Sequence, residues 1–405
     1  MQYKKAIIIF LCIIVLSAVS IGEIYIHMHT KNIEDTPSER ADSTPAFQEQ
    51  YIASSSEVVS DKNTFLVESE ILNTTSDHTT VTATSTAVQK IPPDVSITHT
   101  TTEIMGWIYP GPPACSAVNE IADGRKIDVL KAEYFAITEA GVLTMLTTAH
   151  DGCNAYSENN IALLKRYAEA QYVTVSVNYA DSMERFLTND IHTSIDTLVS
   201  FVQVHDLTGV ELDFEDFGGW SDNRYALYKQ FVTTLGTALH AQGKKLMIDG
   251  PAVSNKDEET WYLWRYKDFI ALPVDQIVIM MYDYQFDHGV GNPVSPLAWM
   301  RDVILWTKRT YPNLDKLVIG LPSYGYRGTE GTQKMSLLTY DQIKKESGFN
   351  MATRDSLSGE MTWKNGTTRY FYQDSESLRI KRELVESLGI TSISVWHLGG
   401  NQWFR

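Results

Sequence analysis

The sequence predicts an α/β protein whose main domain, residues 103–405, is a (β/α)8 TIM barrel. Two observations predict this fold. Eight short apolar runs, each typical of a buried strand, alternate with helical patterns. Their number and span match an eight-stranded parallel barrel, which typically takes about 250 residues. A doubly wound open sheet is the alternative, but no glycine-rich phosphate-binding loop follows the first run.

The eight expected strands lie, in chain order, in EIMGWIYPG, DVLKAEYFAIT, QYVTVSVNYA, GVELDFEDF, KLMIDGPAV, QIVIMMYDYQ, KLVIGLPSYGY and ITSISVWHLGG. The segments between them carry helical periodicity. Residues 222–243, for example, place apolar side chains at three- and four-residue steps from Tyr228 to Leu239. Gly243 follows where a C-terminal cap belongs, so we expect a helix between the fourth and fifth strands.

The interval between the seventh and eighth runs is longer than the others. Within it, Asn365-Gly366 stands between alternating apolar and polar residues, a strong hairpin signal. We therefore expect a small α+β insertion, about residues 328–375, between strands 7 and 8. It would form one wall of a groove on the C-terminal face of the barrel.

Residues 1–28 read as an export signal or a membrane anchor. Lys4 and Lys5 precede an uninterrupted apolar run, residues 6–22. Ala18 and Ser20 offer a cleavage site for a signal peptide, but the run approaches the length of a membrane span, which favours an uncleaved anchor. Either way, the rest of the chain is expected to be extracytoplasmic, membrane-anchored or secreted.

Residues 29–102 are expected to be a disordered, flexible linker. Between Leu72 and Thr102, 14 of the 31 residues are Ser or Thr and none is aromatic. Such a segment buries too little apolar surface to offset the entropy of ordering it. Its expected role is spacing.

The formal net charge of −16 excludes some classes of partner. Nucleic acid requires a basic surface that displaces counterions, so no nucleic-acid partner is expected. The same charge disfavours docking of the folded domain on anionic lipid, which leaves residues 1–28 as the expected membrane contact. We expect a monomer.

Two cysteines, Cys115 and Cys153, lie outside the apolar N-terminal run. In an oxidising compartment they predict one disulfide, with two free thiols as the alternative. Neither has a second cysteine or a histidine at ligand spacing, so we expect no metal site and no cofactor.

The run GVELDFEDF places Glu211, Asp213 and Glu215 on alternate positions. Successive side chains of a strand point to opposite faces, so the three acids share one side and the apolar residues the other. In a barrel the acids would face the interior, where burial and mutual repulsion disfavour ionisation. At least one should hold a proton near neutral pH and serve as a general acid. A solvated edge strand is the alternative, but a barrel has no edge.

Three motifs carry a resemblance to glycoside hydrolase family 18, the chitinase family. TGVELDFE resembles that family's Asp-Gly-x-Asp-x-Asp-x-Glu signature on the fourth strand. MMYDYQ is similar to its Met-x-Tyr-Asp motif at Met280, Tyr282 and Asp283, and ISVWHLGG resembles its eighth strand, with Trp396 as the floor beneath the sugar. The segments after residue 317 are most similar to the branch of spore-cortex and cell-wall lytic enzymes.

The resemblance implies hydrolysis of β-1,4 bonds in an N-acetylglucosamine polysaccharide, chitin or peptidoglycan, by a substrate-assisted retaining mechanism. Glu215 would be the general acid and base. Asp213 would hold the amide N–H of the substrate, and Tyr282 would orient its acetamido oxygen. Asp283 would bind the sugar, which would stack on Trp396.

The sequence departs from the family signature at two positions. Thr208 stands where the signature has its first Asp. Because Thr208 lies at an even position and the three acids at odd positions, its side chain should point away from them. Glu211 replaces an Asp and keeps the charge, which indicates a tuned site. Two further candidates for binding the sugar, Trp107 and Tyr109, lie on the first run.

Tyr134, on the second run, is another candidate for the sugar site, and Met280 would bind substrate beside Tyr282. For Tyr134, as for Trp107 and Tyr109, the alternative is that the side chain only packs in the core of the barrel.

Two other functions compete with hydrolysis. A non-hydrolytic chitinase-like lectin would use the same groove, but such lectins usually lose the acid that Glu215 supplies. A metal-dependent barrel lyase would draw its ligands from several strands, whereas here three acids come from one strand.

Overall fold

The computed structural model describes residues 102–404 and contains a closed barrel of eight parallel strands. The order is β1-β14-β8-β7-β6-β5-β4-β2, and the pairing of β1 with β2 closes the ring. All eight expected strands are confirmed: β1 Glu103–Ile108, β2 Val129–Ile137, β4 Ala170–Val177, β5 Gly209–Phe214, β6 Lys245–Pro251, β7 Gln276–Met280, β8 Leu317–Pro322 and β14 Ser392–Trp396. A short strand, β3 Leu143–Met145, pairs antiparallel with β2.

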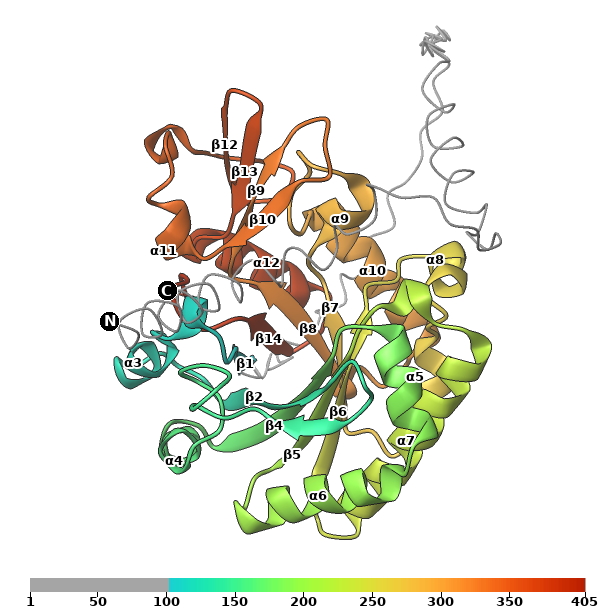
Figure 1. Cartoon of the computed structure of the whole chain (residues 1–405). Helices are drawn as coiled ribbons and strands as arrows, with labels where there is room; N and C mark the ends of the chain where they lie inside the picture. Colours follow the sequence, from blue (N-terminus) through green and yellow to red (C-terminus); the bar gives the residue numbers. More distant parts are fainter. Residues whose placement is uncertain (1–101, 405) are drawn as a thin grey trace, which may run out of the picture. The chain divides into compact units, whose positions relative to one another are not determined.

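Helices follow the strands and cover the outside of the barrel (Figure 1). The expected helix after the fourth barrel strand is α7, which Ser221 caps at its N-terminus and which ends just before Gly243. The bounds are α3 Ala117–Ala122, α4 Glu158–Tyr167, α5 Ala180–Thr188, α6 Ile191–Val204, α7 Asp222–His240, α8 Lys256–Trp261, α9 Tyr284–His288, α10 Leu297–Thr310 and α12 Ser375–Ser387.

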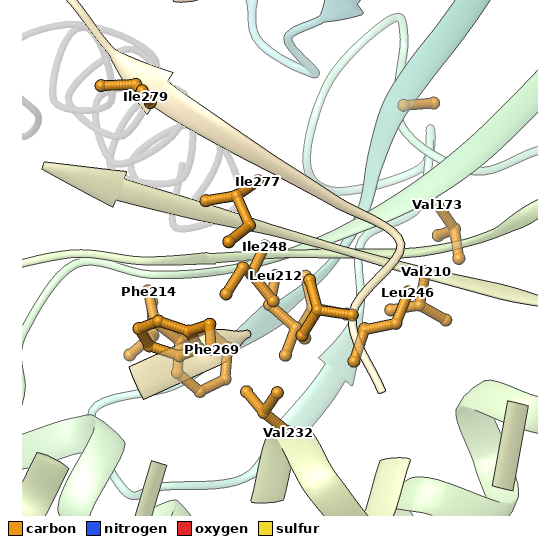
Figure 2. Close-up of a cluster of buried hydrophobic side chains, with 14 of the residues drawn as sticks. Val173, Val210, Leu212, Phe214, Val232, Leu246, Ile248, Phe269, Ile277 and Ile279 are labelled. Atoms are coloured by element: carbon orange, nitrogen blue, oxygen red, sulfur yellow. The ribbon is translucent and has the colours of Figure 1, made fainter. Parts of the chain in front are cut away.

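The main hydrophobic core lies between the strands and the helices. Figure 2 shows Leu212 and Phe214 of β5 beside Val232 of α7 and Phe269, and all four are buried. Phe214 packs against Phe231 of α7 with ring centroids 6.0 Å apart. The even-numbered residues of β5 therefore face the helices, which leaves the odd-numbered acids for the barrel interior.

A second cluster of buried apolar side chains fills the barrel interior at the N-terminal ends of the strands. Its members come from six strands, so they meet only because the barrel closes: Met105, Val129, Tyr172, Met247, Val278 and Val318. The inward-facing polar residues therefore lie nearer the C-terminal ends of the strands, where barrel enzymes have their active sites.

The expected insertion between strands 7 and 8 is a separate five-stranded antiparallel sheet in the order β10-β9-β13-β12-β11. Its strands are β9 Gly325–Thr329, β10 Met335–Leu338, β11 Thr353–Arg354, β12 Met361–Asn365 and β13 Thr368–Tyr372, with α11 Tyr340–Ile343 beside them. The Asn365-Gly366 hairpin is confirmed, since β12 and β13 pair across it and Gly366 has a φ of 62°.

The expected anchor and nearly all of the expected linker, residues 1–101, lie outside the described residues. Between Thr102 and Phe404, no helix is both long enough and apolar enough to span a bilayer.

Candidate active site

The three acids of the fourth barrel strand lie as the alternation predicts. Glu211 is fully buried and Asp213 is 9% exposed. Glu215 follows the end of β5, is partly buried, and donates its backbone N–H to the carbonyl oxygen of Val177 over 2.9 Å. The acids are thus arranged in depth, from the barrel interior outward to the C-terminal face.

Burial and nearby negative charges raise the pKa values of two of these acids. Burial, then the negative charges of Asp283 and Glu133, raise the pKa of Glu215 to about 7. Burial, then the charge of Glu215, raise the pKa of Asp213 well above its ordinary value. Glu215 can therefore both give and accept a proton near neutral pH, as a general acid and base must.

Tyr282 and Asp283 follow β7 and lie with the acids. The ring of Tyr282 is 6.4 Å from that of Trp396, the last residue of β14, and the two rings are inclined by 29°. Oδ1 of Asp283 accepts hydrogen bonds from the hydroxyls of Tyr324 and, over 2.9 Å, Tyr326. These tyrosines lie between β8 and the second sheet and on β9, so the inserted segment helps to hold Asp283.

Burial raises the pKa of Asp283 to about 6, and the two tyrosine hydrogen bonds limit that rise. Burial also raises the pKa of Tyr282 well above its ordinary value, as do the negative charges of Asp249 and Asp213. Tyr282 therefore keeps its proton and remains a hydrogen-bond donor across the pH range in which Glu215 titrates.

The two aromatic candidates of the first strand lie at different depths. Tyr109 lies just beyond β1, with its ring 6.2 Å from that of Trp396 and edge-on to it. Trp107 is deeper and only 3% exposed, and its ring faces the ammonium of Lys131 at 4.8 Å. Tyr109 is thus placed beside Trp396, whereas Trp107 lies inside the barrel.

Tyr134 and Met280 are not brought to the acids by any observed contact. Tyr134 is 1% exposed and packs against Phe201 of α6, with ring centroids 6.4 Å apart. Tyr134 therefore packs in the main core, which was the alternative to a role in the sugar site. Alternation gives the reason, because Tyr134 shares its side of β2 with Leu130 and Ala132, which also pack into the main core. Met280 ends β7, where it packs against the main core.

The structure adds two acids that the motif analysis missed. Glu133 of β2 accepts a hydrogen bond from Oγ of Ser176 over 2.7 Å, and burial raises its pKa to about 7. Asp249 of β6 is 1% exposed, and burial, then the charge of Glu211, raise its pKa well above the ordinary value. A signal was present, since each is an acid at an inward position of an apolar run.

The predicted disulfide between Cys115 and Cys153 is confirmed, with Cα atoms 5.6 Å apart. Cys115 follows β1 and Cys153 follows the β2–β3 hairpin. The bond therefore joins two loops that both begin at the C-terminal face of the barrel.

Within residues 102–404, no group of three or more His, Cys, Asp or Glu side chains is arranged to hold a metal ion. His397 follows Trp396, is buried, and has its pKa lowered to about 4 by that burial. It is neutral at physiological pH.

Solved structures share this fold. A chitinase from Chromobacterium violaceum ATCC 12472 superimposes with a TM-score of 0.61 at 22% identity, over 74% of this chain and 95% of that one. The spore cortex-lytic enzyme SleL from Bacillus megaterium QM B1551 gives a TM-score of 0.62 at 18% identity, over 77% of this chain and 73% of that one. At these identities the likeness concerns the fold.

Two proteins of Bacillus subtilis (strain 168) are similar in sequence. The uncharacterized glycosylase YvbX is 26% identical over 217 residues, covering 50% of this chain and 61% of that protein. A cortical fragment-lytic enzyme is 24% identical over 238 residues, covering 55% of this chain and 54% of that protein. The match thus spans between half and two thirds of each relative.

The family model for glycosyl hydrolases family 18 matches residues 173–401. This range includes the acidic strand, Tyr282 and Asp283, and Trp396, which carried the resemblance in the sequence. The chain therefore belongs to glycosyl hydrolases family 18.

Proposed function

We propose that this protein hydrolyses β-1,4 glycosidic bonds in an N-acetylglucosamine-containing polysaccharide, with Glu215 as general acid and then general base. One observation carries the proposal. Glu215 lies at the C-terminal end of β5 with a pKa of about 7, at the position of the family's catalytic acid. A group that must donate a proton and later remove one works best when its pKa is near the working pH.

In the proposed reaction, Glu215 protonates the glycosidic oxygen while the acetamido oxygen of the substrate attacks the anomeric carbon. Asp213 holds the amide N–H and stabilises the positive charge that develops on the oxazolinium-like intermediate. The intermediate then reacts with water, from which Glu215 takes a proton, and the product keeps its original anomeric configuration.

The aromatic groups position the sugar in this proposal. Tyr282 donates to the acetamido oxygen, consistent with a phenol whose pKa is raised well above its ordinary value. Trp396 presents a flat face for the apolar side of the ring. Since Oδ1 of Asp283 accepts hydrogen bonds from two tyrosine hydroxyls, Oδ2 is the oxygen proposed to contact the substrate.

Between the two polymers, we propose peptidoglycan. The sequence predicts an anchor and a spacer before the barrel, which would place the enzyme near its own envelope. One relative is named as a cortical fragment-lytic enzyme, which is consistent with this choice. Incubation of residues 103–405 with chitin oligosaccharides and with purified sacculi, followed by mass spectrometry of the products, separates the two substrates.

Glu215→Gln tests the assigned acid. Loss of general acid catalysis should lower kcat by about 100- to 10,000-fold. Glu139→Gln is the matched control, because Glu139 is exposed just after β2 and should tolerate the same change. An undiminished rate for Glu215→Gln refutes the assignment. Binding of oligosaccharide by the unaltered protein without release of product would instead indicate the lectin.

A further inference from the structure

A lysine is buried inside the barrel next to the acidic strand. Lys131 of β2 has no exposed surface, and its Nζ forms an ion pair with Oε1 of Glu211. The ring of Trp107 covers the ammonium at 4.8 Å. The other oxygen of Glu211, Oε2, accepts a hydrogen bond from Oγ1 of Thr174 over 2.7 Å. Both oxygens of Glu211 are therefore held, in a site without contact with solvent.

This lysine faces an unusual concentration of acids. In the part of the chain that the structure describes, it is the only Lys or Arg that forms an ion pair with any of six acids in and around the site. These acids are Glu133, Glu211, Asp213, Glu215, Asp249 and Asp283. One positive charge among six buried or partly buried acids must influence how many of them ionise.

Glu211 connects Lys131 to its acidic neighbours. The charge of Glu211 raises the pKa of both Asp249 and Asp213, and its hydrogen bond with Asp249 adds to the effect. The charge of Lys131 acts in the opposite direction and lowers the pKa of Asp249. Burial raises the pKa of Glu133 on β2 and of Tyr172 on β4, and the charge of Glu211 adds to the rise of each.

We propose that Lys131 is a positioning residue for the hydrolysis: its ion pair holds the side chain of Glu211 behind Asp213 and places a positive charge beside the acids of the site. This proposal rests on the hydrolase function proposed above. It also gives a reason for the departure from Asp at this position, since the longer side chain of Glu211 reaches across from β5 to a lysine on β2.

The two partners should act in opposite directions on the pH profile of kcat/KM. The acidic limb of that profile reports the acids that must be ionised before substrate binds. Lys131→Met removes the positive charge, so ionisation becomes harder and this limb should move up by about 1 pH unit. Glu211→Gln leaves an unopposed ammonium, so the limb should move down. The double variant should return close to the original profile, because both charges are gone.

Lys381→Met is the matched control. Lys381 is also fully buried and paired with a buried acid, Glu360, but in another part of the fold. A purely structural contribution would lower the unfolding midpoint in both lysine variants without moving either limb. Where a variant is too slow to assay, the pH dependence of its binding of chitin oligosaccharide, followed by tryptophan fluorescence, reports the same ionisations.

The role of Lys131 is overturned if the acidic limbs of both single variants coincide with that of the unaltered enzyme. It is also overturned if the two limbs move in the same direction. If Lys131→Met does not fold, Glu211→Gln and the double variant decide the question: the first must move down and the second must not. An unaltered protein that cleaves neither chitin oligosaccharides nor sacculi refutes the hydrolase function itself, a different outcome from an active enzyme whose limbs do not move.

Discussion

The charge of Asp283 should set the alkaline side of the enzyme's pH profile. The basic limb of kcat/KM reports deprotonation of the general acid, Glu215, whose pKa is about 7. Asp283 contributes the largest charge effect on that pKa. With its own pKa at about 6, Asp283 is ionised over the range in which Glu215 titrates. Asp283→Asn should therefore move the basic limb to lower pH.

The size of this movement follows from the contributions to the pKa of Glu215. That pKa rises from 4.5 to about 7, and burial is the largest cause, followed by the charges of Asp283, Glu133 and Asp216. Asp283 thus accounts for less than half of the rise, and the limb should move by up to about 1 pH unit. An Asn oxygen can still accept the hydrogen bonds of Tyr324 and Tyr326, so the geometry should survive.

The assay is the pH dependence of kcat/KM between pH 4 and 9 on whichever polymer the unaltered enzyme cleaves. Asp287→Asn is the matched control, since Asp287 is exposed on α9 and is not among the charges that raise the pKa of Glu215. Its basic limb should stay in place. If the basic limb of Asp283→Asn moves to higher pH, or coincides with that of the control, then the charge of Asp283 does not raise the pKa of Glu215.

Two further predictions concern stability. Lys381→Met should lower the free energy of unfolding, measured by urea titration, by about 3 to 5 kcal/mol, because it leaves Glu360 buried without its ion pair. Lys345→Met is the control, since Lys345 is exposed and its replacement should change the free energy of unfolding little. Glu215→Gln should be more stable than the unaltered protein at pH 8, by about 1 to 3 kcal/mol, with the advantage disappearing by pH 4.5. The sign follows from the raised pKa of Glu215. An acid that holds its proton more tightly in the folded state than in the unfolded state destabilises the fold as pH rises from 4.5 through 7. A stability advantage of Glu215→Gln that stays constant with pH would contradict this prediction.

Local patterns in the sequence predict the barrel, the chain order of its strands and the shared face of the three acids. Alternation along GVELDFEDF is a property of a single strand, so it predicted that Glu211, Asp213 and Glu215 share one face. The positions of Tyr282 and Trp396 followed from motifs at strand ends, because parallel strands present their C-terminal ends on one face. The Asn365-Gly366 turn is likewise a local signal.

Which side chains meet across the closed barrel depends on how all the strands assemble, and no local pattern predicts it. Lys131 and Glu211 are 80 positions apart, and no local pattern says that β2 and β5 face each other at the same depth. Asp249 of β6 joins them for the same reason. The bulge in β2 had the opposite effect, since it directs Phe135, which alternation would place inward with Lys131, onto Phe201 of α6. Periodicity is set within one element, whereas the charge balance of the site depends on the register and closure of all eight strands.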